Sequence, residues 1–68
     1  MSLAKVIEVV SSSDKSFEDA IKQGVADAAQ TLRGITGVDV RSWTADVADN
    51  KITTYKVTLH VAFKVERT

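Results

Sequence analysis

The sequence predicts an α+β domain with the element order β-α-β-β, in which a three-stranded antiparallel sheet packs on one helix. Two periodicities predict it. Apolar residues recur every three or four positions over residues 14–33, as in an amphipathic helix. Over residues 55–66 apolar and polar residues alternate, as in a strand with one buried face. The chain has 68 residues, so we expect a single domain over residues 1–68.

The first strand is predicted over residues 4–10, which are rich in valine and isoleucine. The segment 11–14 reads Ser-Ser-Ser-Asp, residues that favour turns and helix caps. We therefore expect this strand to end at Val10.

The helix is predicted over residues 14–33. Its apolar stripe comprises Phe17, Ile21, Val25, Ala28 and Leu32. Ser13 is the expected N-cap, with Ser16 as the alternative one turn later, and Gly34 lies where a left-handed C-cap is expected. Gly24 lacks a side chain, which predicts a close approach of another backbone at that point of the helix.

Two further strands follow, over residues 38–47 and from Tyr55 onwards, joined by a reverse turn at residues 48–51. The last strand has the longest unbroken alternation, so it is expected at the centre of the sheet, with its apolar face under the helix. The uninterrupted alternation of the second strand would place Trp43 on the same face as Gly37.

Composition excludes several function classes. Nine basic and nine acidic residues give a net charge of zero, which argues against binding nucleic acid or acidic lipid by charge. There is no cysteine and only one histidine, so disulfides, thiolate nucleophiles and histidine clusters are excluded. The apolar segment near the N-terminus is too short for a signal peptide or a membrane span, and we expect a cytoplasmic protein. A core this small usually needs a supplement, and oligomerisation is the natural one.

The other face of the predicted sheet carries Thr58, His60 and Ala62, which suit a subunit contact or a wetted surface. No carboxylate or nucleophile is placed by sequence beside His60, so we interpret it as a structural or interface residue. No catalytic residue is predicted.

Polar residues near the hairpin leave several alternatives open. The carboxylates of Asp39, Asp46 and Asp49, with Asn50, could bind calcium or magnesium, but they lack the spacing of a calcium loop and suit solvated turns better. Trp43 suits sheet packing or an interface, or the stacking of a planar ligand.

Two cations on neighbouring strands, Arg41 and Lys56, could hold a phosphate or carboxylate. Equally, they could pair with acidic residues of this chain. The candidate partners are Asp39, Asp46 and Glu66.

Three segments carry a resemblance to a known family. They are Val-Ile-Glu-Val-Val at residues 6–10, Ala-Ala-Gln-Thr-Leu-Arg at residues 28–33, and Tyr-Lys-Val-Thr-Leu-His-Val-Ala-Phe at residues 55–63. With these segments the chain resembles the dodecins over nearly its whole length. The resemblance implies a hollow homododecamer of β-α-β-β subunits, with sheets inward and helices outward, which binds riboflavin or FMN for storage without catalysis.

The resemblance also indicates where a flavin would bind. In flavin-binding dodecins a tryptophan at the start of the second strand stacks on the ring, and a glutamine near the start of the third contacts its polar edge. The aligned positions here hold Gly37 and Lys56. We expect Gly37, Val38, Arg41 and Lys56 to form the site. The alternative is a shell that binds metal ions such as calcium instead of flavin, or is purely structural.

Overall fold

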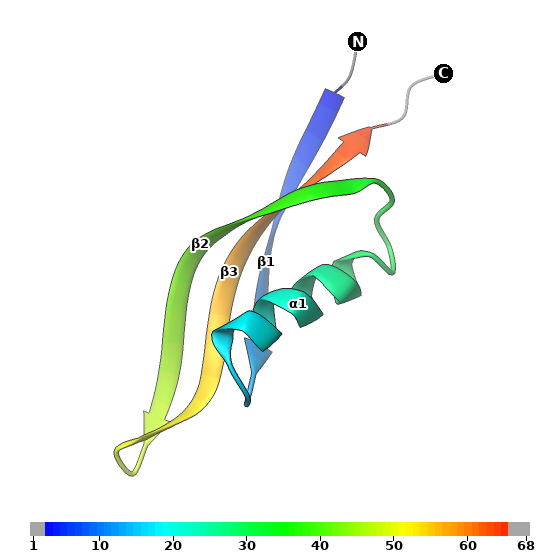
Figure 1. The fold of residues 1–68 in the computed structure, drawn as a ribbon. Helices are drawn as coiled ribbons and strands as arrows, with labels where there is room; N and C mark the ends of the chain where they lie inside the picture. The colour runs from blue at the N-terminus through cyan, green and yellow to red at the C-terminus, as the bar shows by residue number, and fades with distance from the viewer. Residues whose placement is uncertain (1–2, 66–68) are drawn as a thin grey trace.

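The computed structural model describes residues 3–65 and has the predicted element order. Strand β1 (Leu3–Ser13) leads into helix α1 (Phe17–Ala28), which is followed by β2 (Ile35–Ala48) and β3 (Lys51–Val65). The three strands form one antiparallel sheet in the order β1-β3-β2 (Figure 1). The last strand is thus central, as predicted.

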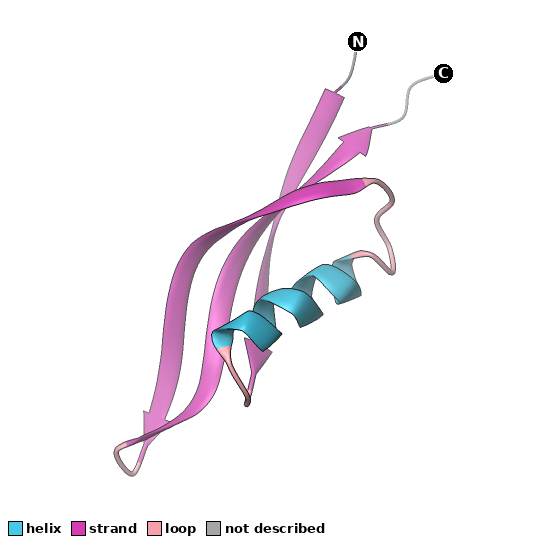
Figure 2. Ribbon diagram, viewed as in Figure 1, coloured by secondary structure: helices cyan, strands magenta, loops and turns pink. Residues whose placement is uncertain are grey.

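Helix α1 covers one face of the sheet (Figure 2). The buried core consists of Ala20 on the helix and Val57, Leu59 and Val61 on β3. These β3 residues belong to the predicted alternation, so the prediction that the helix covers its apolar face is confirmed. The last residue assigned to that alternation, Glu66, lies outside the described residues. No helix within residues 3–65 is long and apolar enough to cross a membrane.

At Gly24 the helix packs tightly against the sheet. A Cβ atom at this position would lie 2.8 Å from Leu59 Cδ1 and 3.0 Å from Ser11 Cβ. Both separations are shorter than ordinary carbon–carbon contact, so a side chain at this position would force Leu59 and Ser11 to shift. The close packing predicted for Gly24 is confirmed, but the atoms that approach it belong to side chains and not to another backbone.

Strand β1 continues past Val10, so its predicted end was wrong. Its last three residues, Ser11–Ser13, pair in register with Val57, Lys56 and Tyr55 of the central strand. The serine hydroxyls favour a turn locally, but the unpaired edge of β3 offers backbone hydrogen bonds that keep the chain extended. Tertiary pairing therefore outweighs local turn preference here.

The helix is shorter than predicted at both ends. It is capped by Ser16, the predicted alternative, whose extended backbone turns the chain and whose Oγ accepts the N–H of Asp19 at 2.9 Å. Ser13 is buried instead, and its hydroxyl donates to the Asp19 carboxylate at 2.6 Å. Two serines thus hold one aspartate at the start of α1.

At its other end α1 stops at Ala28, and Gly34 does not cap it. Gly34 has a φ of +73° and lies in the connection to β2, where its carbonyl accepts the N–H of Lys64 at 2.9 Å. Its left-handed conformation was foreseen correctly, but Gly34 directly precedes β2 instead of ending the helix.

The β2–β3 hairpin has the predicted turn and longer strands than predicted. Asp49 and Asn50 have φ values of +52° and +62°, the conformation of a tight two-residue hairpin turn, which aspartate and asparagine tolerate. Strand β2 starts at Ile35 rather than Val38. Its pairing with β3 shifts register between Ile35 and Gly37, between Val40 and Ser42, and between Asp46 and Val47.

Candidate functional site

The sheet has a second face, turned away from α1, which no element within residues 3–65 covers (Figure 1). Buried and partly exposed residues alternate along β3, and its buried residues face the helix. The residues between them therefore point to the other side. Along β3 they are Lys56, Thr58, His60 and Ala62. We call this side of the sheet the open face.

Gly37 lies at one end of the open face, paired in register with Ala62. A Cβ atom at Gly37 would have no other atom within 4 Å. Its neighbour Val38 pairs with the buried Val61, so the Val38 side chain belongs to the helix side of the sheet. Of these two predicted site residues, only Gly37 contributes to the open face.

Lys56 lies toward the other end of the open face, where it forms an ion pair with Asp46 of β2. The Lys56 Nζ and Asp46 Oδ2 atoms are 3.1 Å apart, and the two side chains are 42% and 55% exposed. Five hydroxyl residues surround Lys56 on this face. They are Ser12 on β1, Ser42 and Thr44 on β2, and Thr54 and Thr58 on β3. The lysine thus lies in a polar patch with a carboxylate beside it.

Arg41 pairs with Asp39 of its own strand, at 3.1 Å between Nη1 and Oδ2. Both cations nominated from the sequence are therefore paired with carboxylates, one of the two alternatives that the sequence left open. The third candidate partner, Glu66, lies outside the described residues.

The predicted site residues do not meet within one chain. Gly37 is opposite Ala62, whereas Lys56 is opposite Thr44. Lys56 and Ala62 are six positions apart along β3, which corresponds to about 20 Å of strand. A ligand touching both Gly37 and Lys56 would need one residue from each of two copies.

His60 has a partner that sequence reasoning missed. Its Nε2 atom lies 2.8 Å from Oε1 of Glu8 on β1, and on its other side it is in register with Asp39 of β2. The sequence places no carboxylate beside this histidine, because Glu8 and His60 are 52 positions apart, but the fold brings Glu8 to it. Only the register of β1 against β3 would have revealed the pair. This arrangement can exchange a proton or link the two strands.

Trp43 lies on the helix side of the sheet, so its predicted face was wrong. The register shift between Val40 and Ser42 reverses the alternation of β2, and Trp43 pairs with the buried Val57. Its ring packs edge to face on Phe17 at the start of α1, with ring centroids 5.1 Å apart. Phe17 meets Tyr55 in the same way at 5.0 Å. Trp43 therefore joins an aromatic cluster away from the open face.

The carboxylates considered as metal ligands are dispersed. Asp39 pairs with Arg41 and Asp46 with Lys56, while Asp49 forms part of the hairpin turn. Throughout the described range 3–65, no three His, Cys, Asp or Glu side chains come close enough together to hold a metal ion.

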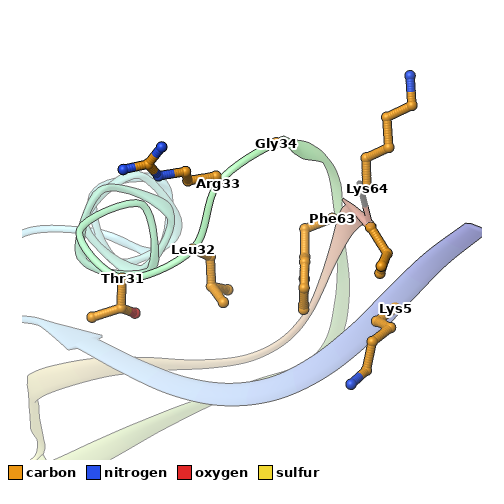
Figure 3. A pocket seen from close by; sticks show the side chains of 8 residues that line it. Lys5, Thr31, Leu32, Arg33, Gly34, Phe63 and Lys64 are labelled. Atoms are coloured by element: carbon orange, nitrogen blue, oxygen red, sulfur yellow. The ribbon is translucent and has the colours of Figure 1, made fainter. Parts of the chain in front are cut away.

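A cavity of about 420 Å³ lies beside the connection from α1 to β2 (Figure 3). Leu32 and Phe63 point into it, and three cations, Lys5, Arg33 and Lys64, lie around it. The candidate ligand residues of the open face do not line this cavity. Its lining residues come from three separate segments of the chain, so no local sequence pattern predicts it.

Comparison with known proteins gives consistent results. A sequence model of the Dodecin family matches residues 3–66. The dodecin of Thermus thermophilus is 31% identical over 64 residues, covering 94% of this chain and 93% of that protein.

Solved structures agree with this relationship. A point variant of the T. thermophilus dodecin superposes with a TM-score of 0.94 at 29% identity, covering all of both chains. The Streptomyces coelicolor dodecin gives 0.93 at 27% identity, covering 98% of this chain and 96% of that one. A calcium-chelating antigen of Mycobacterium tuberculosis, described as a calcium dodecin, gives 0.81 at 30% identity, with 97% and 94% coverage. The chain belongs to the dodecin family.

Proposed function

We propose that this dodecin forms a hollow homododecamer that binds and stores a flavin of the riboflavin or FMN type, without catalysing a reaction. Family membership supports a binding role. The observation that carries the flavin proposal is the open space at Gly37, where a Cβ atom would meet nothing within 4 Å. A planar ring can lie flat against a surface formed by two small residues, Gly37 and Ala62.

In this proposal the flavin site lies between two copies of the chain. Gly37 and Ala62 of one copy form the floor under the ring. Lys56 of the other copy supplies a hydrogen-bond donor for its polar edge, since Gly37 and Lys56 of one chain lie about 20 Å apart. The proposal gives Val38 no contact with the ligand, because its side chain lies on the helix side of the sheet. Arg41, which pairs with Asp39, has no assigned role in it.

Gly37 occupies the position of the flavin-stacking tryptophan, and this predicts how its replacement would change the flavin affinity. An aromatic side chain at Gly37 would add stacking worth about 0.5–1.5 kcal/mol beyond the apolar area that it buries. We therefore expect Gly37→Trp to bind riboflavin more tightly than the wild-type protein, by roughly threefold to tenfold.

A fluorescence titration tests the proposal. Riboflavin and FMN are titrated with protein whose mass has been measured by light scattering, and quenching of flavin emission is followed. Saturable quenching is the expected result. An intact dodecamer that quenches neither flavin, even as Gly37→Trp, would contradict flavin storage.

Calcium or magnesium binding is the second candidate. It is favoured by the structural similarity to the calcium dodecin of M. tuberculosis. The open face carries three carboxylates, those of Glu8, Asp39 and Asp46, and oxygen ligands suit these ions. Calorimetric titration with calcium chloride tests this candidate. Heat of binding without flavin quenching would favour an ion-binding shell, and neither signal would favour a purely structural one.

A further inference from the structure

The Lys56–Asp46 ion pair places a pure donor beside a pure acceptor on an uncovered surface. An ammonium group only donates hydrogen bonds, and an ionised carboxylate only accepts them. Their polar atoms lie 3.1 Å apart on neighbouring strands. A primary amide carries the same two functions in one group. The pair can therefore present a ligand with the donor and acceptor that an amide side chain would offer.

The exposure of the pair allows it to be shared with a ligand. With side chains 42% and 55% exposed, Lys56 and Asp46 attract each other only weakly through the surrounding water. Partial opening of their contact toward a ligand therefore costs little. The hydroxyls of Ser12, Thr44 and Thr58 surround the pair and can replace part of its hydration.

The charges of the pair select the chemistry of the ligand. A phosphate would gain from Lys56 but would be repelled by Asp46 a few ångströms away. A neutral group that has a carbonyl next to an N–H satisfies both residues, because the carbonyl accepts from Lys56 and the N–H donates to Asp46. This pattern occurs along the edge of a cyclic imide, such as the pyrimidine side of a flavin ring.

We propose that Lys56 and Asp46 together recognise the imide edge of a planar ligand, and that Asp46 is the residue that makes this site specific for a ligand N–H. The inference rests on the proposed flavin function and assigns a role to a carboxylate that the sequence analysis considered only as a metal ligand or ion-pair partner. It predicts that Asp46 distinguishes riboflavin from riboflavin methylated at N3, which lacks the N–H.

The test is a set of quenching titrations with riboflavin and N3-methylriboflavin. The wild-type protein is compared with Asp46→Ala, Lys56→Gln and the double variant. Glu18→Ala serves as the matched control, since it removes a carboxylate that is paired with a lysine, Lys22, on α1 and away from the open face. Light scattering confirms that each variant keeps the wild-type mass.

The expected pattern follows from hydrogen bonding to a charged group. Asp46→Ala should weaken riboflavin binding about tenfold or more and remove the preference over N3-methylriboflavin. In the Lys56→Gln variant, adding Asp46→Ala should change the riboflavin affinity by less than about threefold. The glutamine amide then supplies both the hydrogen-bond donor and the acceptor. Glu18→Ala should bind like the wild type.

The two proposals fail in different ways. The role of Asp46 would be overturned if Asp46→Ala left the riboflavin affinity unchanged. It would also be overturned if this substitution lowered the affinity equally in the wild type and in Lys56→Gln. In both cases the flavin function would stand. An intact wild-type dodecamer that quenches no flavin would overturn the flavin function and this inference together.

Discussion

Two glycines of this chain differ in their surroundings: Gly24 is needed for packing, whereas Gly37 belongs to the proposed binding surface. Gly24 faces Leu59 and Ser11 at distances that exclude a Cβ atom, whereas Gly37 faces open space. The sequence predicted the first role, because a glycine inside an amphipathic helix needs a packing reason. It could not show that Gly37 borders open space, since that depends on the pairing of β2 with β3.

Substitution of these glycines by alanine should therefore have unequal effects. Gly24→Ala gains helix propensity but forces the buried Leu59 to move, and we expect it to lower the free energy of unfolding by about 1–2 kcal/mol. Gly37→Ala, the control, should change it by less than about 0.5 kcal/mol. Guanidinium denaturation measures both. Equal effects of the two substitutions would contradict the close contact at Gly24.

Asp19 gives the stability of the helix start a defined pH dependence. The hydrogen bonds from Ser13 and Gln23 hold the pKa of its carboxyl below the ordinary value. A carboxyl whose pKa is lower in the folded state stabilises the fold above its unfolded pKa of about 4, and this contribution is lost as the pH falls through the folded pKa.

We therefore expect Asp19→Asn to be less stable than the wild type at neutral pH, with the difference shrinking progressively below pH ~4. Denaturation midpoints measured from pH 7 to pH 3 test this. Glu18→Gln, which alters the neighbouring exposed carboxylate, is the control. A difference that is constant over the whole range would show that the Asp19 charge has no such role.

At the scale of elements, register shifts in β2 account for the largest departure from the sequence prediction. A plain alternation puts Trp43 on the face of Gly37, but the shift between Val40 and Ser42 turns it toward α1. The periodicity of β3 is unbroken over its buried residues and was predicted correctly. A β-bulge leaves the composition of a strand unchanged but changes the face to which the following side chains point. Only the cross-strand pairing shows where this happens.

The position of Trp43 predicts that it has no part in ligand binding. Trp43→Phe should leave the riboflavin affinity within about twofold of the wild type, because the ring lies on the opposite side of the sheet from the proposed site. Trp43→Ala should lower stability by about 1 kcal/mol or more through loss of the edge-to-face contact with Phe17. Quenching titrations and denaturation measure the two effects separately. A large loss of affinity in Trp43→Phe would contradict this assignment.

At the scale of the whole molecule, one chain is too extended to bury much surface. Its radius of gyration is 14.1 Å and its extents are 54 × 19 × 13 Å, whereas a compact domain of this length has a radius of about 11 Å. Several large apolar side chains in the described range are exposed. They are Leu3, Val6, Val10, Val38, Trp43, Val47 and Ile52. The expectation from chain length, that oligomerisation supplements a small core, agrees with this shape.

The proposed assembly has a direct test. Light scattering at micromolar concentration should give about twelve times the subunit mass of 7.4 kDa, unchanged on dilution, because the exposed apolar residues need partners. A sample that is monomeric or dimeric under these conditions would contradict the shell. The sequence supports the assembly through its resemblance to a family. The residues that join one copy to the next cannot be predicted from the alternation of apolar and polar residues along the strands.

The central position of β3 also bears on how the sheet arises during folding. Strands β1 and β2 lie on opposite sides of β3 and do not pair with each other. The β2–β3 hairpin can close early through its tight turn, but β1 must join across a span such as the 52 residues between Glu8 and His60. Such distant pairing is slow because the loop entropy is lost before the contacts form. We therefore expect the hairpin to form first and β1 to dock on it, so that the apolar residues of β1 lack a partner until the hairpin has formed.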